Sequence, residues 1–290
     1  MAESAVAGLP TSAARRPGGM DKGAFLAVGF LAALVFAALA APWLAPHDPL
    51  AQPDIVSGRL SPPDATHPFG TDVFSRDVFS RVLFGARISL SVGVLATALS
   101  VTLGMTYGIV AGYAGGMVDT VLMRLLDGFL AIPRVLLILV LVSATGSLPL
   151  PALIAVLGFT GWFHVARLVR AEALVARELD YVTAARALGA NGWRIVSRHI
   201  LPNVMTPAAV AAVLGFAHTV VLEAGLSYLG LGVQPPTPSW GNIMLEGTDQ
   251  LRTAWWLALF PGALLFATVV SVNTLAERLR SSRTGAIFLQ

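Results

Sequence analysis

The chain carries six long apolar stretches that are separated by polar segments. Each stretch holds about 20 residues, the length that an α-helix needs to cross the roughly 30 Å hydrocarbon core of a bilayer. Such segments must be helical, because lipid offers no partner to unpaired backbone N–H and C=O groups. The pattern therefore predicts an all-α polytopic membrane protein with six transmembrane helices, at residues 24–45, 88–111, 118–144, 152–170, 204–224 and 254–276.

Glycine and proline mark two further features of this pattern. Between the third and fourth stretches, the segment 146–151 contains two prolines and predicts a short turn, because proline breaks a helix. Within the second stretch, Gly104, Gly108 and Gly112 recur every fourth residue. Small residues at this spacing allow two membrane helices to pack closely.

The composition agrees with a membrane protein and excludes several kinds of site. Hydrophobic residues make up 56% of the chain and charged residues 12%, against about 25% charged residues in soluble domains. The basic residues cluster at the ends of the apolar stretches, as membrane topology requires, so we predict no nucleic-acid partner. The chain has no cysteine, which excludes disulfides and thiolate sites. We also predict no metal site, because the histidines lack partners at ligand spacing: His47, His67, His164, His199 and His218.

The chain divides into four parts. Residues 1–22 are rich in Ala, Ser, Gly and Pro and predict a disordered cytoplasmic N-terminus, in which Met20 is an alternative start to Met1. Residues 23–87 hold the first transmembrane helix and an external loop. A signal peptide cleaved near Ala38 is the alternative, but the uncharged run exceeds the usual length of about 7–15 residues. Five further transmembrane helices form a core domain, 88–277, and a cytoplasmic tail follows, 278–290.

The arginines predict the orientation. They are concentrated at the N-terminus, in the 165–203 segment and in the C-terminal tail, which six spans place on one side of the membrane. Positively charged segments stay in the cytoplasm. We therefore expect a multi-pass protein of a bacterial or archaeal plasma membrane with both termini in the cytoplasm. The 47–87 and 226–252 loops would then face outward.

The most informative polar segment is 180–203, DYVTAARALGANGWRIVSRHILPN. Good helix formers from Thr183 to Leu188 predict a first helix, and Gly189 suits the left-handed position that ends it. Asn191 is a good N-cap for a second short helix over Gly192 to Ile200. Pro202 would lie in the first turn of the fifth span. The residues alone leave two interpretations open: the hairpin docks into a cytoplasmic partner, or it contacts only its own protein.

The TAARALG and RHILPN sequences of this segment resemble the "EAA" loop of ABC-importer permeases. The chain keeps Ala184, Ala185, Gly189, Leu201 and Pro202 of that pattern. It departs at Thr183, where the family favours Glu, and at His199, where the family favours Ile. Two other segments, 67–90 and 223–243, resemble the C-type permease subunits of dipeptide, oligopeptide and nickel importers. Ser75 stands where that pattern often has Gly.

The resemblance implies a type I ABC-importer permease fold and a non-catalytic subunit, with 88–277 as the core permease domain and 178–203 as its coupling loop. It implies as partners a second homologous permease, two ATP-binding subunits, an extracytoplasmic solute-binding protein and membrane lipid. ATP and Mg would be bound by the partner subunits, and no cofactor is expected on this chain. The substrate would be a peptide. The residues expected to couple to the ATPase are Thr183, Ala184, Ala185, Arg186, Gly189, Arg194, Leu201 and Pro202.

Four charged residues within or beside the spans are candidates for the transport pathway: Arg124, Asp127, Arg134 and Glu223. Intramembrane charges are costly and often functional. Arg124 and Asp127 can instead pair with each other, at i and i+3 on one helix face. For Glu223 we favour a position at the membrane interface. A stand-alone secondary transporter or channel that uses these charges is the alternative function. No catalytic residues are predicted, because the chain lacks the phosphate-binding GxxxxGK[ST] and HExxH motifs.

Overall fold

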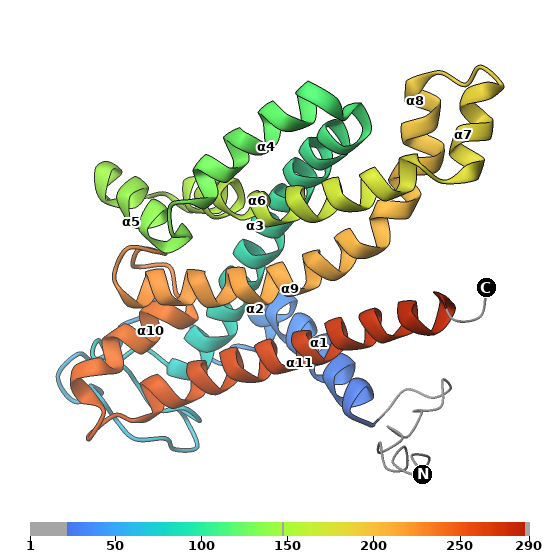
Figure 1. The fold of residues 1–290 in the computed structure, drawn as a ribbon. Helices are drawn as coiled ribbons and strands as arrows, with labels where there is room; N and C mark the ends of the chain where they lie inside the picture. Colours follow the sequence, from blue (N-terminus) through green and yellow to red (C-terminus); the bar gives the residue numbers. More distant parts are fainter. Residues whose placement is uncertain (1–21, 147, 288–290) are drawn as a thin grey trace, which may run out of the picture.

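The computed structural model describes residues 22–146 and 148–287, and these residues form a bundle of helices (Figure 1). Five helices are long and apolar enough to cross a membrane, and a bent pair gives a sixth span if its two helices cross together. This confirms the predicted all-α class and agrees with six spans. In chain order the spanning elements are α1 (Lys22–Leu39), α3 (Val78–Ala114), α4 (Gly116–Leu130) with α5 (Arg134–Thr145), α6 (Leu150–Arg177), α9 (Leu201–Tyr228) and α11 (Trp256–Ile287).

Helices α3 and α6 pack closely through the predicted glycine stripe. A Cβ atom added to Gly104 would lie 2.6 Å from the side chain of Val165, and one on Gly108 would lie 2.6 Å from the carbonyl oxygen of Ala166. At Gly112 the same atom would lie 2.7 Å from a side chain of α6. Only a hydrogen atom fits at these positions, so the expected close helix contact is confirmed.

The third span is not the single helix that we predicted over 118–144. It breaks between α4 and α5, whose axes differ by 74°. Pro133 explains the break, since proline lacks an N–H and also disfavours the helical conformation at the preceding residue, Ile132. The predicted turn before the fourth span is confirmed, because α5 ends at Thr145 and α6 begins at Leu150.

Other predicted boundaries shift. The first span ends at Leu39 and is followed by a separate short helix, α2 (Ala41–Leu44). The second begins at Val78 rather than at residue 88, because Asp77 caps its N-terminus by accepting a hydrogen bond from the Ser80 N–H. The last span runs as α11 to Ile287, so most of the predicted tail is helical. The predicted disorder of the N-terminus falls on residues 1–21, outside the described residues.

The predicted 226–252 loop contains two helices, α10 (Trp240–Gly247) and the 3₁₀ turn η2 (Thr248–Gln250). Ser239 begins α10 with a capping box: its side chain accepts a hydrogen bond from the Asn242 N–H, and the Asn242 side chain accepts one from the Ser239 N–H. This local signal was missed because glycine and proline dominate the surrounding sequence. α10 packs against α9 and α11.

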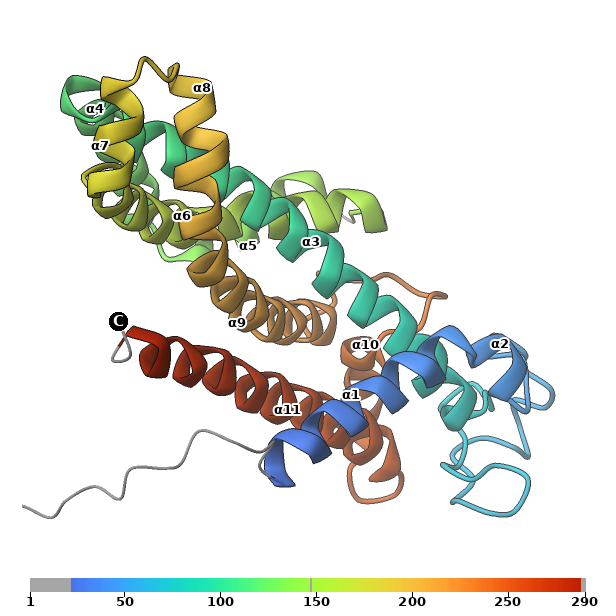
Figure 2. The same cartoon turned by 90° about the vertical axis from the view of Figure 1, so that its right-hand side faces the viewer.

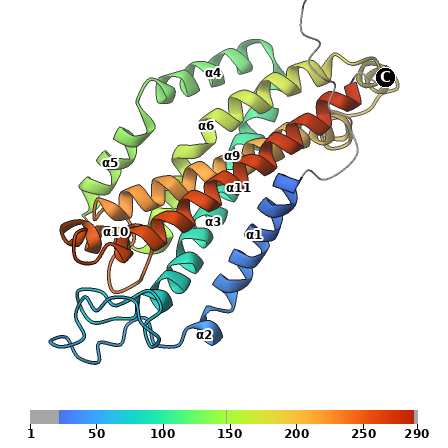
Figure 3. The same cartoon turned by 90° about the horizontal axis from the view of Figure 1, so that it is seen from below.

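The two ends of the bundle carry different structures. Short helices α7 (Asp180–Ala187) and α8 (Gly192–Ile195) project from one end, where α11 also finishes (Figures 1 and 2). At the opposite end lie α2, α10 and the loop between α2 and α3 (Figure 3).

Candidate functional site: a projecting helical hairpin

The α7–α8 hairpin has the turn that its sequence predicts. Gly189 follows α7 with φ +81°, in the left-handed region that favours glycine. The Ala190 N–H donates to the carbonyl oxygen of Ala185 over 3.0 Å and closes the end of α7. Asn191 then caps α8, because its side-chain oxygen accepts a hydrogen bond of 2.8 Å from the Arg194 N–H. Local hydrogen bonds therefore fix the direction of the tip.

One face of the hairpin is anchored in the bundle. Val182 of α7 and Ile195 of α8 are fully buried, together with Ile200. They share an apolar cluster with Val169 and Ala173 of α6. Because buried apolar contacts resist displacement, the hairpin is held against α6 along this face.

The tip of the hairpin presents large apolar side chains to the surroundings. Leu188 is 89% exposed and Trp193 is 78% exposed, one on each side of the turn. The arginines predicted to lie there, Arg186 and Arg194, are exposed as well. Exposed apolar groups with a charged rim mark protein interaction surfaces, in which tryptophan and arginine are enriched.

The second arm of the hairpin is continuous with a spanning helix. We expected a separate short helix over Gly192 to Ile200, but α8 passes through one π-helical segment, η1 (Val196–Ile200), directly into α9. The whole stretch from Gly192 to Tyr228 forms one candidate span. The second arm of the hairpin is therefore joined to α9 by continuous helical backbone.

A polar contact closes the base of the hairpin. The Asn203 side-chain amide donates to the Tyr181 hydroxyl over 2.7 Å and to the His199 carbonyl oxygen over 2.6 Å. The rings of Tyr181 and His199 lie 5.7 Å apart. Neither Tyr181 nor Asn203 was predicted as a site residue, because the contact joins two elements 22 positions apart.

The predicted coupling residues occupy two different environments. Thr183, Ala184, Arg186, Gly189 and Arg194 are exposed on the hairpin, where a partner can reach them.

The remaining three lie closer to the bundle. Ala185 is half-buried within α7. Leu201 packs against the apolar cluster below the hairpin, so its contribution is to anchor the hairpin. Pro202 is exposed at the start of α9, away from the tip.

The predicted pairing of Arg124 with Asp127 is wrong. Asp127 accepts a hydrogen bond of 2.5 Å from Arg167 of α6, and both side chains of this ion pair are more than half exposed. Arg124 is exposed on the same helix, α4. A second ion pair, between Asp119 and Arg170, also joins α4 to α6. Contacts between helices therefore replace the local i, i+3 pair.

The other two pathway candidates, Arg134 and Glu223, differ in how deeply their side chains are buried. Arg134, at the start of α5, donates to the Leu157 carbonyl oxygen over 2.9 Å and is half-buried. Glu223 is fully buried in α9 and accepts a hydrogen bond of 2.7 Å from Ser227. Protein surrounds the Glu223 side chain, and its depth relative to the membrane interface stays a prediction.

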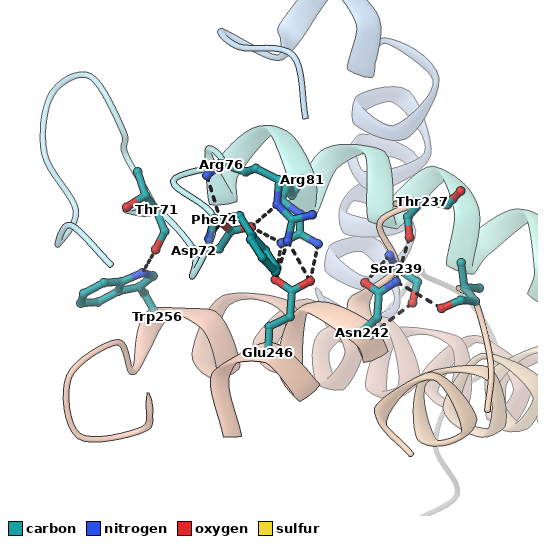
Figure 4. A network of polar contacts seen from close by, with 11 residues as sticks. Thr71, Asp72, Phe74, Arg76, Arg81, Thr237, Ser239, Asn242, Glu246 and Trp256 are labelled. Carbon is teal, nitrogen blue, oxygen red and sulfur yellow. Dashed lines mark hydrogen bonds and ion pairs between the residues drawn. The ribbon is translucent and has the colours of Figure 1, made fainter. Parts of the chain in front are cut away.

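At the end opposite the hairpin, a buried network of ion pairs holds α10 against the loop before α3 (Figure 4). Glu246 of α10 accepts two hydrogen bonds of 2.9 Å from Arg76 and is also bound by Arg81, whose nearer nitrogen lies 2.5 Å away. Asp72 pairs with both arginines from the loop side. The network joins the loop before α3 to α10, so two segments that are distant in sequence form one surface.

Three possible metal ligands also meet at this end. His47, His67 and Asp77 each bring one donor atom within 4.8 Å of the others. These three residues are far apart in the sequence, so the spacing of the histidines does not indicate the group.

Comparison with known proteins agrees with this architecture. A family profile described as "binding-protein-dependent transport system inner membrane component" matches residues 104–284. A second profile, the N-terminal transmembrane domain of oligopeptide transport permease C, matches residues 20–63.

Among curated relatives, a protein of Brucella suis biovar 1 named as a peptide transport system permease is 42% identical, covering 85% of this chain and 82% of its own. A di/tripeptide transport system permease protein of Pseudomonas aeruginosa is 37% identical, covering 90% and 88%. A glutathione transport system permease protein of Pectobacterium atrosepticum is also 37% identical, covering 87% and 83%.

Solved structures confirm the fold. The inward-facing MetNI methionine ABC transporter matches with a TM-score of 0.57 at 18% identity, over 70% of this chain and 96% of that chain. An amino acid ABC transporter matches with a TM-score of 0.53 at 15% identity. With a profile that covers more than half of its length and relatives above one-third identity, the chain belongs to the family of binding-protein-dependent transport system inner membrane components.

Proposed function

We propose that this chain is the permease subunit of an ATP-driven peptide importer and that the α7–α8 hairpin couples it to an ATP-binding subunit. The peptide substrate is supported by the names of its relatives, which include peptide and di/tripeptide permeases. The observation that carries the coupling role is the pair of exposed apolar residues, Leu188 and Trp193, at the tip of a hairpin whose base is buried. Hydrolysis of ATP takes place on the partner subunits.

The hairpin suits this role because it combines a fixed shape with a direct mechanical connection. Its turn is set by Gly189 and Asn191, so little conformational freedom is lost when a partner binds. Its second arm runs into α9 without interruption. Closure of the ATP-binding subunits therefore moves the tip and tilts α9, which changes access to the pathway from one side of the membrane to the other.

The orientation follows from charge. The hairpin and the end of α11 lie at the same end of the bundle, and both regions are rich in arginine. The positive-inside rule places this end in the cytoplasm. The surface formed by α10 and the loop before α3 then faces outward and receives the solute-binding protein.

A second homologous permease is the proposed partner within the membrane, in an assembly with two ATP-binding subunits. The support comes from the ion pair of Asp127 and Arg167, whose side chains are more than half exposed although they lie on spanning helices. Charges in contact with lipid are costly. This face of α4 is therefore directed at protein or at a water-filled pathway between two permeases.

The test uses the importer purified with its ATP-binding subunits. Replacement of Leu188 and Trp193 by alanine removes the apolar tip while leaving the turn and the buried base unchanged. Loss of a central contact of this kind costs about 2 kcal/mol or more, so the ATP-binding subunit should associate about 30-fold more weakly, and peptide uptake should fall with it. The matched control for association with the ATP-binding subunit is Val56→Ala, which removes an equally exposed apolar side chain at the other end. Normal association and uptake in the double variant would exclude the proposed role.

A further inference from the structure

The two histidines and one aspartate at the end opposite the hairpin form a compact group of metal-binding atoms. His47 follows α2, His67 lies in the loop, and Asp77 precedes the first residue of α3. The His67 Nδ1 atom is 3.0 Å from Asp77 Oδ1, and the His47 Nδ1 atom is 3.9 Å from Asp77 Oδ2. The two imidazole rings are stacked with their centroids 4.8 Å apart.

The carboxylate of this group is fixed in place. Asp77 is almost completely buried, and its Oδ2 atom accepts hydrogen bonds from the backbone N–H of Ser80, at 2.8 Å, and from its hydroxyl, at 2.6 Å. The Ser80 hydroxyl oxygen also accepts a hydrogen bond of 3.2 Å from the His47 N–H. One serine therefore positions both the aspartate and the backbone of the first histidine.

His67 is positioned by a turn of its own. The Asp64 carboxylate accepts hydrogen bonds from the N–H groups of His67, at 2.6 Å, and of Thr66, at 2.8 Å. The Asp64 N–H donates in return to the His67 carbonyl oxygen over 3.0 Å.

We propose that His47, His67 and Asp77 bind a divalent transition-metal ion, with zinc the best match. Imidazole nitrogen and carboxylate oxygen are ligands of zinc, whereas magnesium and calcium prefer oxygen alone. Three protein ligands leave a fourth position for water. The side chains of His47 and His67 are 42% and 22% exposed, so an ion can reach both imidazoles from solvent. The buried carboxylate supplies the fixed point.

Such a site would join three segments that are far apart in the sequence. The metal would connect the end of α2 and the loop to the first turn of α3. The ion would therefore hold the outer end of the first span and the following loop against the second span.

Full-length protein without a polyhistidine tag, stripped of metal in detergent, provides the test. Titration with Co²⁺ should give the visible absorption of a four-coordinate site with one ion per chain, and Zn²⁺ should displace it. His47→Gln and His67→Gln should each weaken binding at least tenfold. His164→Gln is the control, because His164 is an exposed histidine on α6 and should leave binding unchanged. Zn²⁺ should also raise the unfolding temperature of the unaltered protein and of the control more than that of either variant.

Two results would overturn the proposal. One is the absence of one-to-one binding by the unaltered chain at micromolar Co²⁺. The other is binding by both variants with the affinity of the unaltered chain, which would assign the signal to other groups. Each variant is first compared with the unaltered protein by size-exclusion chromatography and by its metal-free unfolding temperature, and the two single variants provide independent measurements.

Discussion

The Asn203 side-chain amide donates a hydrogen bond of 2.7 Å to the Tyr181 hydroxyl and thereby joins the beginning of α7 to the first turn of α9. Tyr181 lies in the first arm of the hairpin, which follows α6. Asn203 lies at the start of α9, the spanning helix that follows the second arm. The contact therefore closes the hairpin at its base. A force applied at the tip reaches α9 through this contact as well as through the continuous backbone of α8 and η1.

Removing this hydrogen bond should loosen the coupling without preventing assembly. Tyr181→Phe retains the ring and deletes only the hydroxyl, a change worth about 0.5–1.5 kcal/mol for one hydrogen bond. We expect ATP hydrolysis to continue while peptide uptake per ATP falls severalfold, as measured in proteoliposomes. Tyr228→Phe, at the far end of α9, is the matched control and should leave the ratio unchanged. An unaltered ratio in Tyr181→Phe would show that the backbone alone transmits the movement.

Gly189 offers a test of the turn that is independent of side-chain contacts. Its φ of +81° is unfavourable for other residues, yet an added Cβ would meet no atom within 4 Å. Gly189→Val should therefore destabilise the turn by about 1–2 kcal/mol through the backbone alone, and both uptake and ATPase co-purification should fall. Gly189→Asn is the control, because asparagine tolerates the left-handed conformation. Equal activity of the two variants would indicate that the turn tolerates another geometry.

The ionic network at the opposite end predicts a stability effect. Glu246→Ala removes one of the two carboxylates that bind the buried Arg81 in the network and leaves only that of Asp72. We expect a loss of about 3 kcal/mol, at the lower end of the range for breaking a buried ion pair because one acid remains. Thermal unfolding in detergent measures it.

Glu178→Ala is the control for this experiment, because Glu178 pairs with Arg177 while its own side chain is largely exposed. An exposed pair contributes about 0–1 kcal/mol. If both variants unfold at the same temperature, the network around Glu246 contributes no more to stability than a surface ion pair.

Local signals made much of the fold predictable. Apolar stretches of sufficient length located the spans, and the turn of the hairpin followed from Gly189 and Asn191, because a left-handed glycine and a capping asparagine act within a few residues. The break at Pro133 was missed because a hydropathy average over 118–144 does not respond to a single proline. Ser75 has φ +64°, in the left-handed region that favours glycine, which agrees with the glycine of the permease pattern that this segment resembles.

Relationships between distant residues were not predictable in the same way. Asp127 pairs with Arg167 rather than with its helical neighbour, because α6 brings a second arginine close. Trp193 is exposed and Ile195 is buried, although they are two positions apart on one short helix. Which of them faces a partner depends on how the hairpin packs against α6, and that packing is a property of the assembled bundle.

Contact between the tip of the α7–α8 hairpin and an ATP-binding subunit can be detected by site-directed cross-linking. The chain has no cysteine, so single cysteines at positions 188, 193 and 56 can each carry a photoreactive maleimide in membranes that contain the assembled importer. We expect a covalent adduct with the ATP-binding subunit from Leu188→Cys and Trp193→Cys, and none from Val56→Cys. Adducts from position 56 alone, or no adduct from either tip position, would contradict it.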